Sequence, residues 1–210
     1  ILPLSFSASP FFEFTREFMN FEPEAWSLRW YRQMVGIASV GDTTVVSNKW
    51  MLGTRNSFII GISATFLATA LGTVAALGLS RRNMPFKGTI MAILISPMIV
   101  PLIITSAGMF FFYSKIGLTH TYLGLILAHT ALGTPFVVIT VTATLTGFDT
   151  NLIRASQSLG ADTMRTFFKV IMPLILPGVI SGALFAFITS FDEVVVVMFV
   201  GSVEQITIPK

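Results

Sequence analysis

Three ionisable residues stand out because of their position in apolar sequence. His129 lies within an apolar run, and Asp192 and Glu193 directly follow another. His129 is the one ionisable group in the apolar run 121–147, where a neutral imidazole can bond a facing carbonyl or hydroxyl or relay a proton. The two acids follow an apolar run, where carboxylates are either solvated at a membrane surface or attract a cation into a pathway. We favour a structural brace for His129 and keep both interpretations of the acids.

Sequence motifs of enzymes are missing. There is no GxxxxGK[ST] loop to hold nucleotide phosphates, no nucleophile–base pair, no HxxxH-type pair of metal ligands, and no glycine loop for a flavin or nicotinamide. No basic patch alternates with aromatic residues, which argues against nucleic acid as a partner. We therefore expect a chain that is not an enzyme by itself and holds no cofactor or metal of its own.

The elements that position these residues are apolar runs long enough to cross a bilayer. Charged residues make up 11% of the 210 residues, the mean hydropathy is +0.80, and a spanning helix needs about 20 apolar residues. These runs predict an all-α transmembrane protein with four spans, Ser57–Ser80, Thr89–Ser114, Thr121–Gly147 and Val170–Phe191. Prolines in the second and fourth spans predict bends that are either static or line a pathway.

The first span carries small residues that are mostly four positions apart. Such a row lets the backbone of a neighbouring helix approach closely. We favour packing within the protomer over a dimer seam or a pathway wall. The row consists of Gly61, Ala64, Ala68, Gly72 and Ala76.

Basic residues indicate the orientation of the spans. The loop 81–87 carries three basic residues and no acid, the loop 148–169 carries three more, and the loop around Lys115 has one firm positive charge. Positive loops favour the cytoplasmic side, so both basic loops are predicted to face inward and residues 5–52 to lie outside.

The outer segment 5–52 mixes acids, bases and aromatic residues. The pattern from Ser27 to Val35 suits a short interfacial helix, with Trp26, Trp30 and Tyr31 at the level of the lipid headgroups. We favour a membrane anchor here over a docking surface for a substrate-delivering protein.

A polar stretch, NLIRASQSLGADTMRTFFKVIMP at 151–173, separates two apolar runs. Asp149 or Thr150 can cap a first short helix, which then carries a narrow apolar stripe formed by Leu152, Ala155 and Leu159. Gly160 can adopt the left-handed conformation that ends this helix, and Asp162 can cap a second helix that leads into the last span. The stretch therefore predicts a bent, exposed knob that a partner can grip.

This stretch resembles the cytoplasmic "EAA" loop of ABC importer permeases, whose pattern is Glu-Ala-Ala, three residues, Gly, nine residues and Ile-x-Leu-Pro. Arg154-Ala155-Ser156 stands at the triplet, Gly160 at the glycine and Val170–Pro173 at the end, with every spacing kept. Arg154 replaces the Glu and Ser156 the second Ala, changes that docking by shape tolerates better than a role specific to that Glu. The resemblance implies a set of residues that couple to the ATPase: Arg154, Ala155, Ser156, Leu159, Gly160, Ala161 and Asp162.

Two further segments resemble permeases of the polyamine type. The sequence SPMIVPLIITSAGMFFFYSKIGL at 96–118 resembles their third span, and FDEVV at 191–195 resembles their Phe-Asp-Asp/Glu-Val-Val segment. We therefore take four residues as candidates for the substrate pathway: His129, Phe191, Asp192 and Glu193.

The resemblance implies a bundle of the type I ABC importer class, in a multi-pass protein of the bacterial inner membrane. It implies ATP-driven import of a small solute, most closely a polyamine such as spermidine or putrescine, with an opine, an amino-acid-like or a ferric substrate as the alternative. The implied partners are an ATPase dimer that binds ATP and Mg, a second permease subunit, an external binding protein and membrane lipid. An ATP-independent transporter or channel is a remoter alternative, because it would need a coupling-ion site at mid-membrane.

We expect one transporter domain over the whole chain. Its parts are an external segment 5–52, three spans within 57–147, a cytoplasmic coupling loop 148–169, a further span 170–191 and an external turn 192–210. The chain begins at Ile1 without an initiator Met and stops at Lys210. We therefore expect an incomplete copy of a protein with about six spans, of which the outermost are incomplete here.

Overall fold

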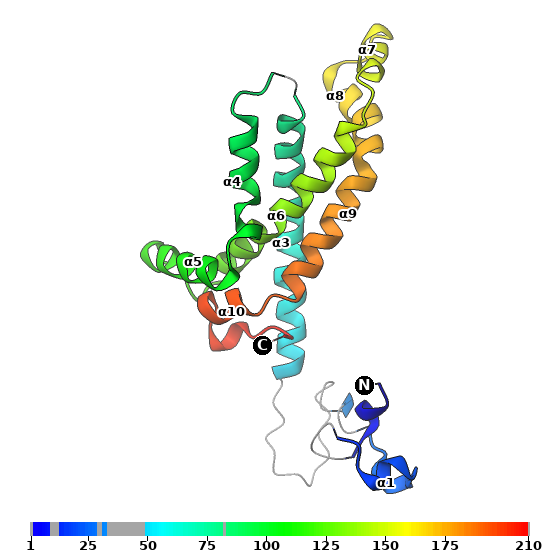
Figure 1. Cartoon of the computed structure of the whole chain (residues 1–210), viewed down its shortest axis with the longest axis vertical. Coiled ribbons are helices and arrows are strands. Elements are labelled where there is room, and N and C mark those ends of the chain that lie inside the picture. The colour runs from blue at the N-terminus through cyan, green and yellow to red at the C-terminus, as the bar shows by residue number, and fades with distance from the viewer. Residues whose placement is uncertain (1, 9–12, 29–30, 33–48, 82, 210) are drawn as a thin grey trace. The chain divides into compact units, whose positions relative to one another are not determined.

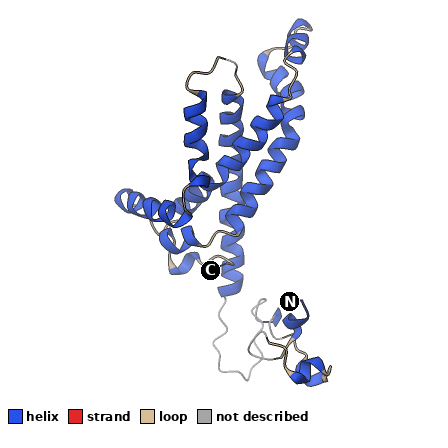
Figure 2. Cartoon of the chain, in the orientation of Figure 1, coloured by secondary structure: helices blue, strands red, loops and turns tan. Residues whose placement is uncertain are grey.

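The computed structural model describes residues 2–8, 13–28, 31–32, 49–81 and 83–209. The described part is helical, apart from an isolated β-bridge between Ser7 and Trp26 (Figures 1 and 2). The all-α prediction is confirmed. The chain separates into two compact units, Ile1–Arg55 and Asn56–Lys210.

The first unit has its own aromatic cluster. It contains a 3₁₀ turn at Leu2–Phe6, helix α1 at Arg16–Met19 and a 3₁₀ turn at Pro23–Ala25. The indole of Trp26 stacks on Phe18 and Phe21, with ring centroids 4.5 and 5.8 Å apart. Trp26 therefore stacks on rings of its own unit while its side chain stays 37% exposed. Most of the interfacial helix predicted at 27–35 lies outside the described residues, as does Trp30.

Three helices of the described chain are long and apolar enough to cross a membrane. They are α3 (Lys49–Leu79), α6 (Tyr122–Thr146) and α9 (Met172–Phe191). A short helix α8 (Thr163–Thr166) and a π-helical turn lead into α9 without a break, so the spanning helix is continuous over Thr163–Phe191. These helices match three of the predicted spans, although α3 starts eight residues before Ser57.

The remaining predicted span, Thr89–Ser114, is broken. Helix α4 (Lys87–Ile99) and helix α5 (Leu102–Ile116) meet at an angle of 103°, so α5 turns aside from the bundle (Figure 1). The break follows from Pro101, because a proline disfavours helical backbone at the residue before it, and Val100 is extended at ψ 136°. With 13 residues, α4 is about 20 Å long. This helix is therefore too short to cross by itself a hydrocarbon core that is about 30 Å thick.

The core of the second unit includes the extensive seam between α6 and α9. Small residues face α6 every four positions along α9, so the two backbones approach closely. A Cβ built on Gly182 would lie 2.8 Å from the Cα of Val137, and one on Gly178 would lie 3.0 Å from the carbonyl of Thr140. The row on α9 consists of Gly178, Gly182, Ala186 and Ser190, all buried.

The small-residue row of α3 is also a packing seam, as predicted. All five of its members are buried, and a Cβ on Gly72 would lie 2.7 Å from the Cβ of Val137 on α6. A Cβ on Gly61 would lie 3.2 Å from the ring of Phe187 on α9. The row therefore brings α3 against both helices of the central seam.

The segment 192–210, expected as an external turn, contains helix α10 (Val195–Val200). Its valines join the core with α5 and α6, because an apolar run of this length is more stable inside the protein than in a solvated turn. A 3₁₀ turn at Val203–Gln205 follows, closed by a capping box between Ser202 and Gln205.

Asn56, at the start of the second unit, ties this C-terminal segment to α3. Its fully buried amide donates to the carbonyls of Glu204 (3.0 Å) and Ile206 (2.9 Å). Its carbonyl oxygen accepts from the hydroxyl of Tyr122 on α6 (2.9 Å). One side chain thus satisfies two loop carbonyls and holds three segments together.

Candidate functional site

The predicted knob lies at one end of the second unit (Figure 1). Helix α7 (Asn151–Ser158) begins where the Asp149 carboxylate accepts from the backbone N–H of Asn151 (2.9 Å), whereas the side chain of Thr150 makes no capping bond. Gly160 follows with φ +83°, the left-handed conformation that the sequence predicted. Asp162 then caps α8 by accepting from the N–H of Arg165 (2.6 Å), also as predicted.

Helix α7 presents two different faces. The predicted apolar stripe faces outward, since Leu152 is 43% and Leu159 88% exposed, and Ala155 is exposed with them. Ser156 faces inward, and its hydroxyl bonds that of Thr166 on α8 (2.9 Å). The pattern that this loop resembles has an alanine at position 156, and an alanine could not make that bond. Ser156 therefore adds a hydrogen bond that ties α7 to α8.

The other coupling candidates are also at the surface. Arg154 and Gly160 are exposed, Asp162 is exposed beside its cap, and Ala161 is half-buried. Leu159 and Gly160 together form the tip, so a partner that grips the knob meets an apolar side chain beside a sharp turn.

The basic loop at the start of α4 lies at this same end. Arg81 lines a cavity together with residues of α7 and α8, so the two basic loops meet in space. Lys115 lies in the last turn of α5, which packs on α10 near the other end of the unit. The two basic loops therefore lie at one end of the unit and Lys115 lies near the other, as expected if the first end faces the cytoplasm. Arg82 lies outside the described residues.

His129 braces the central seam. It is 1% exposed, and its Nδ1 lies 2.8 Å from the hydroxyl of Ser190 on α9. Its Nε2 is buried and has no partner among the described residues. The contact joins α6 to α9, which is the bracing arrangement that the sequence favoured.

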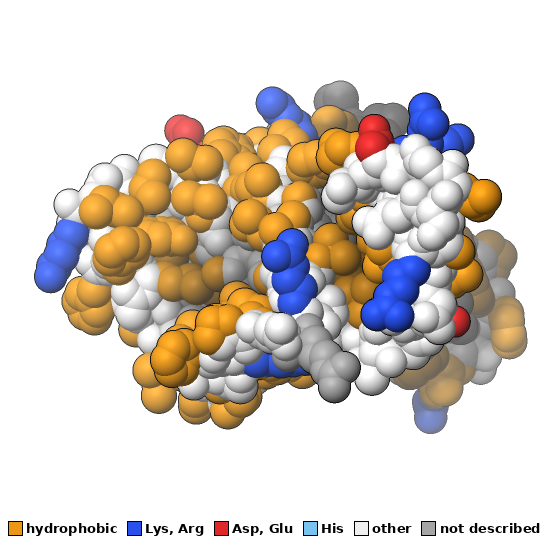
Figure 3. Space-filling view, turned by 90° about the horizontal axis from the view of Figure 1, so that it is seen from above, with side chains coloured by type: hydrophobic (Ala, Val, Ile, Leu, Met, Phe, Trp, Pro, Cys, Tyr) orange, Lys and Arg blue, Asp and Glu red, His pale blue; other side chains and the backbone are white. Residues whose placement is uncertain are grey.

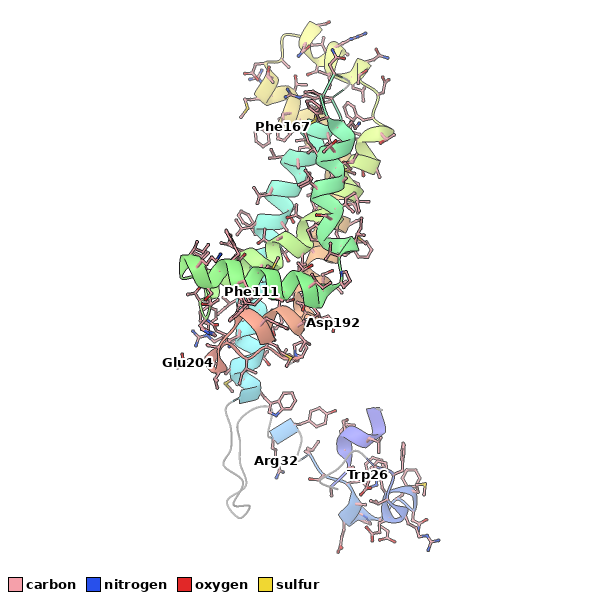
Figure 4. All side chains as sticks on the ribbon, turned by 60° about the vertical axis from the view of Figure 1, so that its left-hand side comes forward. Trp26, Arg32, Phe111, Phe167, Asp192 and Glu204 are labelled. Atoms are coloured by element: carbon pink, nitrogen blue, oxygen red, sulfur yellow. The ribbon has the colours of Figure 1, made fainter. Side chains whose placement is uncertain are left out.

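Asp192 and Glu193 have different surroundings although they are neighbours in the sequence. The Glu193 carboxylate is buried at 7% exposure and accepts from the N–H of Val196 (2.9 Å), so it caps α10. Asp192 is exposed at the end of α9, far from the knob (Figure 4). Of the two acids, Asp192 alone offers its carboxylate to solvent.

Phe191 belongs to an aromatic cluster beside Asp192. Its ring centroid lies 5.5 Å from that of Phe58 on α3 and 5.4 Å from that of Phe187. The rings and the exposed carboxylate therefore occupy one end of the α3–α9 contact. Carboxylates and aromatic faces are the groups that stabilise an organic cation outside bulk water.

Sequence reasoning missed Asn56 and the small-residue row of α9. The sequence contains a pattern that could have indicated each of them. Asn56 is a polar residue directly before an apolar run, and the small residues of α9 have the same four-residue spacing as those of α3. The capping role of Glu193 had no such signal, because α10 was not predicted.

Known proteins show where this arrangement belongs. Residues 68–209 match the family model described as "Binding-protein-dependent transport system inner membrane component". The spermidine/putrescine transport system permease protein PotC of Haemophilus influenzae is 33% identical over 154 residues, covering 73% of this chain and 60% of the relative. The putrescine transport system permease protein PotI of Escherichia coli is 28% identical over 194 residues, covering 88% and 64%.

A solved structure has the same fold. The bacterial ABC transporter involved in the import of the acidic polysaccharide alginate aligns with a TM-score of 0.73 at 16% identity, over 99% of this chain and 68% of that chain. The chain spans about three fifths of the length of these two curated relatives. The matched family covers most of the second unit, including α6, the knob, α9, α10 and the part of α3 that begins at Ala68. The chain therefore belongs to the inner-membrane components of binding-protein-dependent transport systems, as a multi-pass membrane protein.

Proposed function

We propose that this chain is the membrane-spanning permease subunit of an ATP-driven ABC importer. The exposed α7–α8 knob carries the proposal, because it presents an apolar tip at Leu159 beside the left-handed Gly160. Leaving such a tip in water is unfavourable, and exposed apolar patches mark docking sites. The knob is the surface on which we place the ATPase subunits.

The same proposal assigns the partners. Separate ATPase subunits bind ATP and Mg and hydrolyse ATP, a second permease subunit completes the pathway, and an external binding protein delivers the solute. The family description, which names a binding-protein-dependent system, supports the last of these. Purification of the full-length permease from its host should yield an ATPase in stoichiometric amount. A permease that transports after purification without any ATPase would contradict the proposal and support a secondary transporter.

We further propose that the solute is a polyamine or a similar organic cation. The names of the relatives support this class, and so does the exposed acid Asp192, which directly follows Phe191 in the chain. An ammonium group that leaves water needs such partners.

Substitution of Asp192 by asparagine tests this substrate class. We expect Asp192→Asn to slow uptake of a polyamine about tenfold, since a hydrogen bond to a charged group is lost. The measurement is ATP-dependent uptake in proteoliposomes that contain the whole complex and its binding protein. Glu204→Gln is the control, because Glu204 is an exposed acid on the neighbouring turn. Equal rates in the wild type and Asp192→Asn would remove Asp192 from the pathway.

Cysteine labelling tests the orientation. We expect a cysteine at Asn83 to be protected from an impermeant thiol reagent on intact cells and a cysteine at Ser27 to be labelled, because basic loops stay inside. Residues 1–210 contain no cysteine, so within this part of the chain the label reports only the introduced thiol. Labelling at position 83 without labelling at 27 would reverse the orientation and exclude the knob from contact with a cytoplasmic ATPase.

A further inference from the structure

A cavity of about 500 Å³ lies between the α7–α8 knob and the ends of α3 and α6. The polar residues of its lining are Ser80, Arg81, Thr150, Gln157, Thr163 and Thr166. Its volume falls within the range of about 300–1,000 Å³ that is usual for small-ligand sites. Figure 3, which views the molecule from the knob end, shows a hollow with apolar side chains inside it and basic side chains beside it.

The other half of the lining is apolar. Leu77 and Leu145 lie in the last turns of α3 and α6, so the cavity begins at the depth where two spanning helices end. Phe167 lines it at the junction between the knob and the bundle (Figure 4). Phe148, Ile153 and Ile171 complete this half. The lining therefore combines polar and apolar residues near the ends of two spanning helices.

Arg81 is the one charged residue among the described residues that line the cavity. The acids flanking α7 are already engaged, because the carboxylates of Asp149 and Asp162 accept from backbone N–H groups at 2.9 and 2.6 Å. A guanidinium keeps its charge at every physiological pH, and its planar fork matches the oxygens of a phosphate. The net electrostatic preference of the lining is for an anion.

We propose that this cavity binds the headgroup of an anionic phospholipid from the leaflet at the knob end. The phosphate lies on Arg81 and the neighbouring hydroxyls, and the first methylenes of the acyl chains lie against Leu77, Leu145 and Phe148. Basic pockets between spanning helices suit the headgroups of anionic lipids. A free phosphate would leave the apolar half of the lining in water, which is unfavourable.

The site would act on α7 from the side opposite to the ATPase. Thr150, Ile153 and Gln157 line the cavity, whereas Leu152 and Leu159 are exposed on the outward face. A lipid in the cavity therefore supports the knob without competing for its outward face. ATP hydrolysis by the assembled complex is expected to depend on the anionic lipid content of the membrane.

Lipid retention by the purified complex tests the site. The complex with full-length permease is reconstituted in nanodiscs of phosphatidylcholine and phosphatidylglycerol and extracted in mild detergent, and native mass spectrometry counts the phosphatidylglycerol that stays bound. We expect Arg81→Gln to retain about tenfold less than the wild type, because a charge-assisted hydrogen bond is lost. Arg81→Lys is expected to retain an intermediate amount, since it keeps the charge without the fork. The matched control is Lys115→Gln at the other end of the unit, which should retain the wild-type amount.

Two results would overturn the proposal. Equal retention of phosphatidylglycerol by the wild type and Arg81→Gln would show that the lipid binds elsewhere. Displacement of the lipid by inorganic phosphate would identify a soluble-anion site in place of a lipid site. Both measurements concern bound lipid, so they stand apart from the transport assays that test the proposed function.

Discussion

Substitution of Gly160 by valine is expected to abolish ATP-driven uptake while the complex continues to hydrolyse ATP, or to release the ATPase altogether. Gly160 has φ +83°, and a Cβ added there would meet no atom within 4 Å. The penalty is therefore one of backbone strain, which for a β-branched residue in the left-handed region is about 2 kcal/mol or more. The turn relieves this strain by changing its shape, which moves Leu159 relative to α8.

Gly160→Asn is the matched control for this prediction. Asparagine adopts the left-handed conformation far more readily than valine and has a side chain of similar size. We expect Gly160→Asn to keep most of its uptake and Gly160→Val to lose it, with both rates normalised to the amount of assembled complex. Normal uptake by Gly160→Val would show that the shape of the turn does not matter for coupling.

Substitution of Gly182 by leucine should prevent correct folding of the bundle. A Cβ at this position would lie 2.8 Å from the Cα of Val137, a backbone atom that cannot move aside without separating α6 from α9. Overpacking of a tight core costs about 3 kcal/mol. We expect a large loss of monodisperse protein and a lower melting temperature in detergent.

Two smaller substitutions test whether the loss of stability comes from overpacking between α6 and α9. Gly182→Ala adds only the Cβ and should give an intermediate loss of stability. Gly108→Ala makes the same change on α5, where a Cβ would meet no atom within 4 Å. It should leave the melting temperature unchanged or raise it slightly, because alanine favours helix. A melting temperature of Gly182→Leu equal to that of the wild type would contradict the close α6–α9 approach.

Local chemistry determines much of the knob. A left-handed Gly160 and a capping Asp162 depend on neighbouring residues alone, and both predictions are confirmed. Three spans were also predictable, because a long apolar run in water or in a loop is unfavourable in any tertiary context. The same holds for the small-residue row of α3, whose spacing implies a packed face.

Other features depended on contacts between residues far apart in the chain. Pro101 breaks the second predicted span at Val100, and the packing of α5 against α10 then sets where its second half lies. Asp192 and Glu193 looked alike in sequence, yet α10 buries one carboxylate in a cap and leaves the other exposed. The brace between His129 and Ser190 joins residues 61 positions apart.

Sequence alone therefore determined the membrane-spanning class of the protein, three of its spans and its knob, since these follow from apolar length and local backbone preference. Tertiary structure decided which face of α7 is left for a partner and where Arg81 meets the knob in a shared cavity. Both depend on how α3, α6 and α9 pack, and packing is set by side-chain shape across the seam rather than by the order of residues along one helix.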